Sequence, residues 1–245
     1  MPTRGPIALV GSGEYLPVMT EIEGRLIEGR PGRYVQLATA AAPEGVKSLA
    51  HWHRLGREQA ERLGVEQVVV PVVDRVSADD QALAGLVAGA GLIYLSGGNP
   101  PFLAKTLRGT AVWAAIEAAW RDGAALAGCS AGAMALCGEV PEIRRPFTGP
   151  VEGLGAVPGL TVLPHFDRFA RRLPNYVLSR LTTRTDGVVA VGVDEDTALV
   201  SGLRDDPEEW EVMGRQSVWL LRPDGREEHP AGSVVHLPAP RATLD

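Results

Sequence analysis

The sequence contains little cysteine, and the little it has suits neither a disulfide framework nor a metal site. Of the 245 residues only Cys129 and Cys137 are cysteines, and they lie on either side of a serine, Ser130. Two cysteines at this spacing are a poor pattern for disulfide pairing or for metal binding. We therefore expect reduced thiols, a cytoplasmic location, and neither a metal nor another cofactor.

Long apolar runs and clusters of basic residues are also missing. No apolar run approaches the roughly 20 residues that cross a membrane, and the stretch before Gly11 lacks the longer hydrophobic region of a signal peptide. Lysine and arginine are scattered along a chain whose formal net charge is -6. This distribution argues against a nucleic-acid-binding surface, so we expect neither a nucleic acid nor a membrane partner.

The composition is that of an ordinary soluble globular protein, with 45% hydrophobic and 22% charged residues. Apolar stretches of strand length alternate with amphipathic stretches over the first two thirds of the chain. This alternation predicts an α/β fold with a mainly parallel sheet flanked by helices. The predicted strands are 6–10, 33–37, 67–73, 91–95 and 124–127, and the predicted helices are 46–63, 79–88, 101–108, 111–121 and 131–136.

The last third of the sequence has a different pattern, in which short apolar stretches are joined by turn signals at 205–207 and 223–225. We expect an antiparallel extension from about 187 to 240 on one edge of the sheet. It would be part of a single domain that spans residues 1–245. The predicted strands of the extension are 187–193, 197–202, 210–213, 217–221 and 233–237.

A motif with chemical meaning lies at residues 128–132, where Gly-Cys-Ser-Ala-Gly follows a predicted strand and precedes a predicted helix. In this setting Gly-x-Ser-x-Gly builds a sharp turn that projects the serine hydroxyl, which makes Ser130 the candidate nucleophile. The N–H groups that begin the next helix, from Ala131 on, can stabilise an oxyanion. Cys129 is an alternative nucleophile, but we expect its side chain to point away from the pocket as a small buried residue.

A serine nucleophile needs a base within hydrogen-bonding distance, and His165 is the best placed of the five histidines. It follows the apolar stretch 160–163 at a predicted strand end, where sites form in parallel sheets. The short spacing from Ser130 argues against an α/β-hydrolase fold and favours another fold that carries the same chemistry. The other histidines, expected on a helix surface or among the edge strands, are His51, His53, His229 and His236.

The acid that would orient this imidazole is harder to place. No aspartate lies between the candidate nucleophile and the candidate base, and the acids there are Glu139, Glu142 and Glu152. Each could orient the imidazole, and each could equally be a solvated surface carboxylate. Asp167 is only two residues from His165 and is less suited to reach its ring. A Ser–His dyad without an acid is the remaining alternative.

The segment 94–100 includes the end of the predicted strand 91–95 and two consecutive glycines, so the backbone there can approach a ligand closely. We expect the Gly98 amide to join that of Ala131 in an oxyanion hole. Asn99 would then hydrogen-bond the substrate. The alternative is a simple turn with a proline near the start of the next helix.

Two other loops carry weaker signals. The acidic stretch 193–197, which includes Glu195, lies between two predicted strands. It would bind a cation or a basic group of the substrate, or form a plain turn, and we assign Glu195 to substrate binding. The loop 11–14 lacks the third glycine and the Lys-Ser/Thr pair of nucleotide-binding loops, so we do not interpret it as one.

In combination these motifs resemble the serine peptidase family that contains dipeptidase E and cyanophycinase. The matching blocks occur in the family's order and span roughly positions 7 to 202. The resemblance implies a flavodoxin-like fold related to the class I glutamine amidotransferases, with serine where those enzymes have cysteine. The blocks are Tyr-Leu-Ser-Gly-Gly-Asn at 94–99, Gly-Cys-Ser-Ala-Gly-Ala at 128–133, Pro-His-Phe at 164–166 and Gly-Val-Asp-Glu-Asp-Thr-Ala-Leu at 192–199.

The resemblance also implies roles for individual residues. Ser130 would be the nucleophile and His165 the general base, while Gly98 and Ala131 would supply the oxyanion amides. The family carries its orienting carboxylate after the nucleophile helix, where Glu142 is nearest by spacing and Glu152 is next.

We therefore predict a cofactor-independent serine peptidase, either monomer or homodimer, that cleaves a peptide or isopeptide bond in a small Asp-containing peptide. The reaction would pass through an acyl-enzyme on Ser130. In the family, dipeptidase E cleaves after an N-terminal Asp and cyanophycinase releases β-Asp-Arg units. One alternative is a non-catalytic ligand-binding or sensing member of the same fold that lacks the triad acid. Another is a cysteine-dependent enzyme that uses Cys129.

Overall fold

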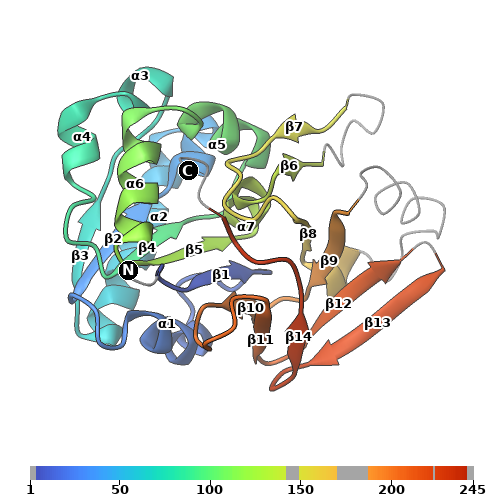
Figure 1. Ribbon diagram of the computed structural model, residues 1–245. Helices are drawn as coiled ribbons and strands as arrows, with labels where there is room; N and C mark the ends of the chain where they lie inside the picture. Colours follow the sequence, from blue (N-terminus) through green and yellow to red (C-terminus); the bar gives the residue numbers. More distant parts are fainter. Residues whose placement is uncertain (1–3, 142–148, 170–186, 223, 242–245) are drawn as a thin grey trace.

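The largest element of the protein is an eight-stranded sheet, seen in a computed structural model that describes residues 4–141, 149–169, 187–222 and 224–241 (Figure 1). The strand order is β14-β11-β10-β1-β5-β4-β2-β3. Strands β1, β5, β4, β2 and β3 run parallel to one another. Strand β10 pairs antiparallel with β1, and β11 and β14 continue the sheet with further antiparallel pairings. The bounds are β1 (Ile7–Val10), β2 (Arg33–Leu37), β3 (Glu66–Val69), β4 (Leu92–Leu95), β5 (Ala125–Cys129), β10 (Thr197–Ser201), β11 (Glu209–Gly214) and β14 (Val234–His236).

The central parallel strands are apolar throughout because helices cover both faces of the sheet. In β1, Ile7 and Leu9 join the core cluster beneath α4 to α7, while Ala8 and Val10 join the cluster beneath α1 and α2. The α-helices are α1 (Thr20–Ile27), α2 (Val46–Leu63), α3 (Arg75–Ala78), α4 (Gln81–Gly85), α5 (Pro100–Leu107), α6 (Ala111–Arg121), α7 (Ala131–Leu136) and α8 (Phe166–Phe169), and the 3-10 helices are Pro17–Met19 and Thr39–Glu44.

Local sequence signals fix where several helices begin and end. The side chain of Asn99 accepts a hydrogen bond from the Phe102 amide at the start of α5, and prolines occupy the first helical positions. Thr110 caps α6 in the same way. Gly64 ends α2 in the left-handed conformation, which glycine adopts without steric cost.

A separate four-stranded sheet, called here the small sheet, has the order β13-β12-β9-β8. Strands β8 and β9 run parallel, and the remaining pairs are antiparallel. In Figure 1 this sheet lies beyond the carboxyl ends of β1 and β5. The bounds are β8 (Leu160–Pro164), β9 (Val189–Val193), β12 (Ser217–Arg222) and β13 (Gly225–Pro230), and a two-stranded pair consists of β6 (Glu139–Val140) and β7 (Val151–Glu152).

The predicted fold class is confirmed, because the protein is α/β with a mainly parallel, helix-flanked sheet and antiparallel strands at its edge. The C-terminal extension is divided, however. Strands β10, β11 and β14 extend the large sheet, whereas β9 and β12 belong to the small sheet with β8. Strand β13 is not among the predicted strands, because its residues are mostly polar and exposed. None of the helices in the described ranges is long and apolar enough to span a membrane.

Candidate active site

Ser130 lies in the sharp turn between β5 and α7. Its φ of 49° and ψ of -105° are unusual for a residue with a side chain. The flanking glycines are required by space: a Cβ at Gly128 would lie 2.5 Å from the carbonyl carbon of Gly132, and one at Gly132 would lie 2.2 Å from the Leu95 oxygen. The motif therefore builds the cramped turn that its sequence predicts, with a partly exposed serine at the tip.

His165 reaches this serine from the small sheet. It follows β8 directly, and its Nε2 lies 3.0 Å from Ser130 Oγ. Its backbone also has a positive φ, 51°. The structure thus brings the candidate nucleophile and the candidate base within hydrogen-bonding distance.

The other nitrogen of this imidazole faces a carboxylate, that of Glu195. His165 Nδ1 lies 2.9 Å from Glu195 Oε1. A carboxylate accepts hydrogen bonds, so it fixes the proton on Nδ1 and leaves Nε2 free to accept from the serine hydroxyl. Glu195, for which the sequence predicts a role in substrate binding, is therefore a partner of the imidazole.

The turn that carries Glu195 is held from several directions. The backbone amide of Glu195 donates to Asp167 Oδ1 at 3.0 Å, and the backbone carbonyl of Glu195 accepts from Gln216 Nε2 at 2.9 Å. Arg168 Nε lies 3.0 Å from the second carboxylate oxygen. These contacts fix both the backbone and the side chain of Glu195 against the imidazole.

The register of the small sheet explains why this acid lies beside the base. Strands β8 and β9 run parallel, with Pro164 opposite Val193. Residues that follow the two strands therefore meet at the same edge, and this places Glu195 beside His165. From the sequence, the candidates for this role are the acids between the nucleophile and the base, and Asp167, because a pairing between distant strands leaves no local pattern.

The expected acids lie elsewhere. Glu139 and Glu152 pair across β6 and β7 and are exposed, and neither is bonded to His165. Glu152 forms an ion pair with Arg108 instead. Glu142 lies outside the described residues. The remaining histidines, on α2, β13 and β14, are His51, His53, His229 and His236.

Asp194, one of the three acids in the stretch 193–197, supports the site from inside. Its carboxylate is buried and accepts from the indole of Trp219 at 3.1 Å and from the amide of Ser217 at 3.3 Å. Trp219 packs beside the buried ring of Phe166, the residue next to His165. Within the described ranges, no group of three or more His, Cys, Asp or Glu side chains is arranged to hold a metal ion.

The two amides expected to form an oxyanion hole lie at the same edge. Gly98 has a φ of 138°, and a Cβ there would lie 2.4 Å from the Ala40 oxygen, so glycine is required. Its neighbours are bonded: Gly97 donates to Glu14 and Asn99 to Ala40. In the part of the chain that the structure describes, the N–H groups of Gly98 and Ala131 have no acceptor.

The thiol of Cys129 is not placed for nucleophilic attack. The residue is fully buried and its Sγ donates to Glu14 Oε2 at 2.8 Å. Burial, reinforced by the charge of this carboxylate, holds the pKa of the thiol well above its ordinary value. The thiol therefore stays protonated, as expected for a small buried residue.

Backbone strain is concentrated at this site. Among the described residues other than glycine, those with positive φ are Tyr15, Ser130, His165 and Asp196. They belong to the loop after β1, the serine turn, the end of β8 and the β9–β10 turn, all of which meet at the site. Such strain persists only where the surrounding structure enforces it, and it clusters at functional sites.

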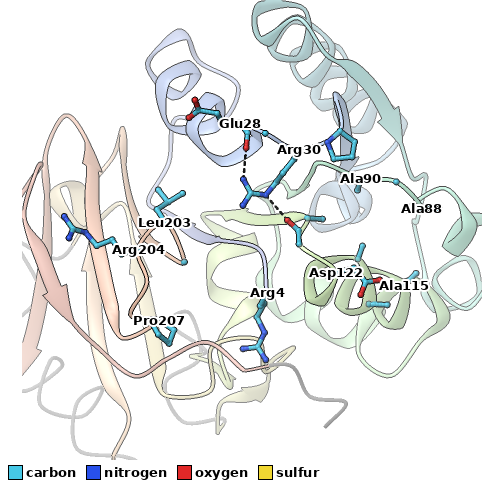
Figure 2. Close-up of a pocket in the computed structure, with 18 of the residues that line it drawn as sticks. Arg4, Glu28, Arg30, Ala88, Ala90, Ala115, Asp122, Leu203, Arg204 and Pro207 are labelled. Carbon is cyan, nitrogen blue, oxygen red and sulfur yellow. Dashed lines mark hydrogen bonds between the residues drawn. The ribbon is translucent and has the colours of Figure 1, made fainter. Parts of the chain in front are cut away.

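A large open cavity of about 1310 Å³ lies at the amino ends of the parallel strands, opposite the candidate active site at their carboxyl ends (Figure 2). Its arginines are engaged by the protein itself. Arg30 donates to the carbonyls of Glu28 and Gly123, and Arg204 pairs with two glutamates of β11. None of Ser130, His165 and Glu195 lines this cavity.

Comparisons with known proteins identify the family and the fold. Residues 48–203, which include the serine, histidine and glutamate, match the model of peptidase family S51. The chain is similar to the crystal structure of a peptidase from an acI-B1 Actinobacterium, with 38% identity and a TM-score of 0.86 over 96% of this chain and 98% of that one. A putative peptidase E protein from Listeria monocytogenes EGD-e, at 16% identity, has the same fold, with a TM-score of 0.57 over 94% of this chain and all of that one. No curated protein matches the chain.

Proposed function

The chain belongs to peptidase family S51 and is a serine peptidase, and we propose that Ser130, His165 and Glu195 are its catalytic triad. One observation carries the proposal: an unbroken line of hydrogen-bonding distances, 3.0 Å from serine to imidazole and 2.9 Å from imidazole to carboxylate. Serine, base and orienting acid in this order are the parts of an activated nucleophile, whichever fold holds them.

The reaction follows from these positions. Ser130 Oγ attacks the carbonyl carbon while its proton passes to His165 Nε2, and the amides of Gly98 and Ala131 stabilise the oxyanion. Nε2 then gives the proton to the leaving amine as the C–N bond breaks, which leaves an ester on Oγ. Water attacks this ester, loses its proton to Nε2, and releases the acid as the proton returns to the serine.

The position of Glu195 argues against the non-catalytic alternative. That alternative depended on a missing triad acid, and this carboxylate is in contact with Nδ1. In the reaction it holds the ring in one orientation and stabilises the imidazolium without taking the proton. Glu142 is not needed for this role.

For the substrate we propose a small Asp-containing peptide with a peptide or isopeptide bond. The sequence resemblance to dipeptidase E and cyanophycinase supports this class. The Arg168 side chain is 69% exposed beside Glu195, so it offers a cation to a substrate carboxylate. Asn99, exposed next to Gly98, is the proposed polar contact on the other side.

The test combines a fluorophosphonate probe with a panel of α-aspartyl dipeptides and β-Asp-Arg. We expect the wild type to be labelled and to release the free amine from at least one of these substrates. Ser130→Ala should fold normally, resist labelling and lose at least about 10³-fold in turnover. Undiminished turnover in this variant would reject Ser130 as the nucleophile, and a wild type without labelling would reject the triad.

A further inference from the structure

The loop after β1 binds the loop that carries Gly98 through two consecutive residues. Glu14 Oε1 accepts the Gly97 amide at 3.1 Å, and the hydroxyl of Tyr15 lies 2.5 Å from Ser96 Oγ. Consecutive residues of one loop therefore hold consecutive residues of the other. Gly98 is the next residue in the chain, so these contacts bear directly on the direction of its N–H.

The loop after β1 is itself firmly anchored. The second oxygen of Glu14 accepts from the Cys129 thiol at 2.8 Å, which ties it to the end of β5. Tyr15 is buried, with its ring 5.1 Å from that of Tyr94, and its carbonyl accepts from Arg62. These contacts anchor the loop to β5, β4 and α2 independently of the Gly98 loop.

The opposite side of the Gly98 loop is held by the 3-10 helix after β2. The Asn99 amide donates to the Ala40 carbonyl at 2.8 Å. A Cβ at Gly97 would lie 2.5 Å from Glu14 Oε1 and 3.6 Å from Ser130 Cβ, so the support on the first side lies next to the nucleophile. The Gly98 peptide is therefore clamped from both sides beside the serine.

We propose that Glu14 is a positioning residue that fixes the oxyanion hole through its hydrogen bond to Gly97, with Tyr15 as its helper. The inference rests on the proposed function, because it assigns the Gly98 amide to the oxyanion. A negative charge near a developing oxyanion opposes catalysis. Glu14 therefore acts as a hydrogen-bond acceptor, and its charge is not the useful property.

The experiment compares Glu14→Ala with Glu14→Gln, whose carbonyl oxygen still accepts from Gly97. Misplacement of one oxyanion donor should lower kcat and the fluorophosphonate labelling rate of Glu14→Ala by about 10- to 100-fold. Glu14→Gln should restore most of this loss. Tyr15→Phe, which removes one hydroxyl contact, should lose about 2- to 10-fold. Glu21→Ala, an exposed glutamate on α1, is the matched control.

Substrate affinity separates positioning from binding. We expect Ser130→Ala and the double variant Ser130→Ala/Glu14→Ala to bind the same dipeptide equally well. Weaker binding by the double variant, with Glu14→Gln as poor as Glu14→Ala, would overturn the inference and assign Glu14 to a cationic group of the substrate.

The labelling rates separate this inference from the proposed function. If the wild type is labelled, Ser130→Ala is not, and Glu14→Ala reacts at the wild-type rate, then the proposed function stands and the positioning role is rejected. If the wild type itself resists the probe, the proposed function has failed.

Discussion

The two sheets of this protein contribute different parts of one site. The large sheet supplies Ser130 and the amides of Gly98 and Ala131 from the ends of parallel strands that are buried on both faces. The small sheet supplies His165 from the end of β8, and it is closed by the polar, exposed strand β13. The proposed chemistry therefore depends on how the two sheets are positioned relative to each other, and this position is set where they meet.

The chain itself joins the two sheets at that point. Strand β9 pairs in the small sheet and β10 pairs with β1 in the large one, and the turn between them carries Glu195. The strained residues divide evenly, because Tyr15 and Ser130 belong to the large sheet's loops, while His165 and Asp196 follow β8 and β9 of the small sheet. Variants on each side of this junction can therefore separate catalysis from the stability of each sheet.

The largest effect is expected at the junction, from Glu195→Gln. The amide keeps the shape of the side chain but removes the charge that orients the imidazole and stabilises its cation, so kcat should fall by about 10²- to 10⁴-fold. Steady-state kinetics against the wild type measures this loss, and a thermal unfolding midpoint close to the wild-type value shows that the fold is kept. A loss in Glu142→Gln with none in Glu195→Gln would return the role to the segment favoured by the sequence.

The next-largest effect is on stability, and it concerns only the part of the protein around the large sheet. It arises from the buried carboxyl group of Glu23 on α1. Burial raises its pKa from 4.5 to about 8, although Gln59 and Tyr34 donate hydrogen bonds to it. The folded protein therefore keeps a proton that the unfolded chain releases above pH 4.5, and the free energy of unfolding falls as the pH rises toward 8.

Glu23→Gln removes this dependence because an amide does not titrate in that range. The pH-dependent loss should shrink by a few kcal/mol, with about 5 kcal/mol as the upper limit. Urea unfolding of wild type and variant at about pH 5 and about pH 8.5 gives the comparison. Glu21→Gln, on the exposed side of α1, serves as the control. An unchanged slope in Glu23→Gln would show that Glu23 is ionised in the folded state.

The smallest effect is expected in the small sheet, from Gly192→Ala. The added Cβ would lie 2.4 Å from the Phe166 ring, so the ring beside His165 must shift. Overpacking of this kind costs about 1–3 kcal/mol, and turnover should fall with it because the base moves. Gly225→Ala is the matched control on β13, where an added Cβ meets nothing within 4 Å. If the two variants have equal stability and turnover, Phe166 does not position His165.

The large sheet and the serine turn could be predicted from sequence because their signals are local. Apolar strands alternate with amphipathic helices, and the turn needs only small residues around Ser130. The division of the last third could not be predicted, since β9 and β10 are both short strands buried over most of their length although they pair in different sheets. Glu195 depends on the parallel pairing of β8 with β9, which no local pattern records. The contacts of Glu14 likewise join strands that are distant in sequence.

The burial of both cysteines has a practical consequence. Cys129 and Cys137 have no exposed surface, and burial also raises the pKa of Cys137, to about 12. The native protein therefore offers maleimides and iodoacetamides almost no thiolate to modify. A single cysteine introduced on β13 and another on α2 can carry a fluorophore pair or spin labels without removal of the native thiols. Distances measured between such labels would report directly whether the two halves of the active site move relative to each other during turnover.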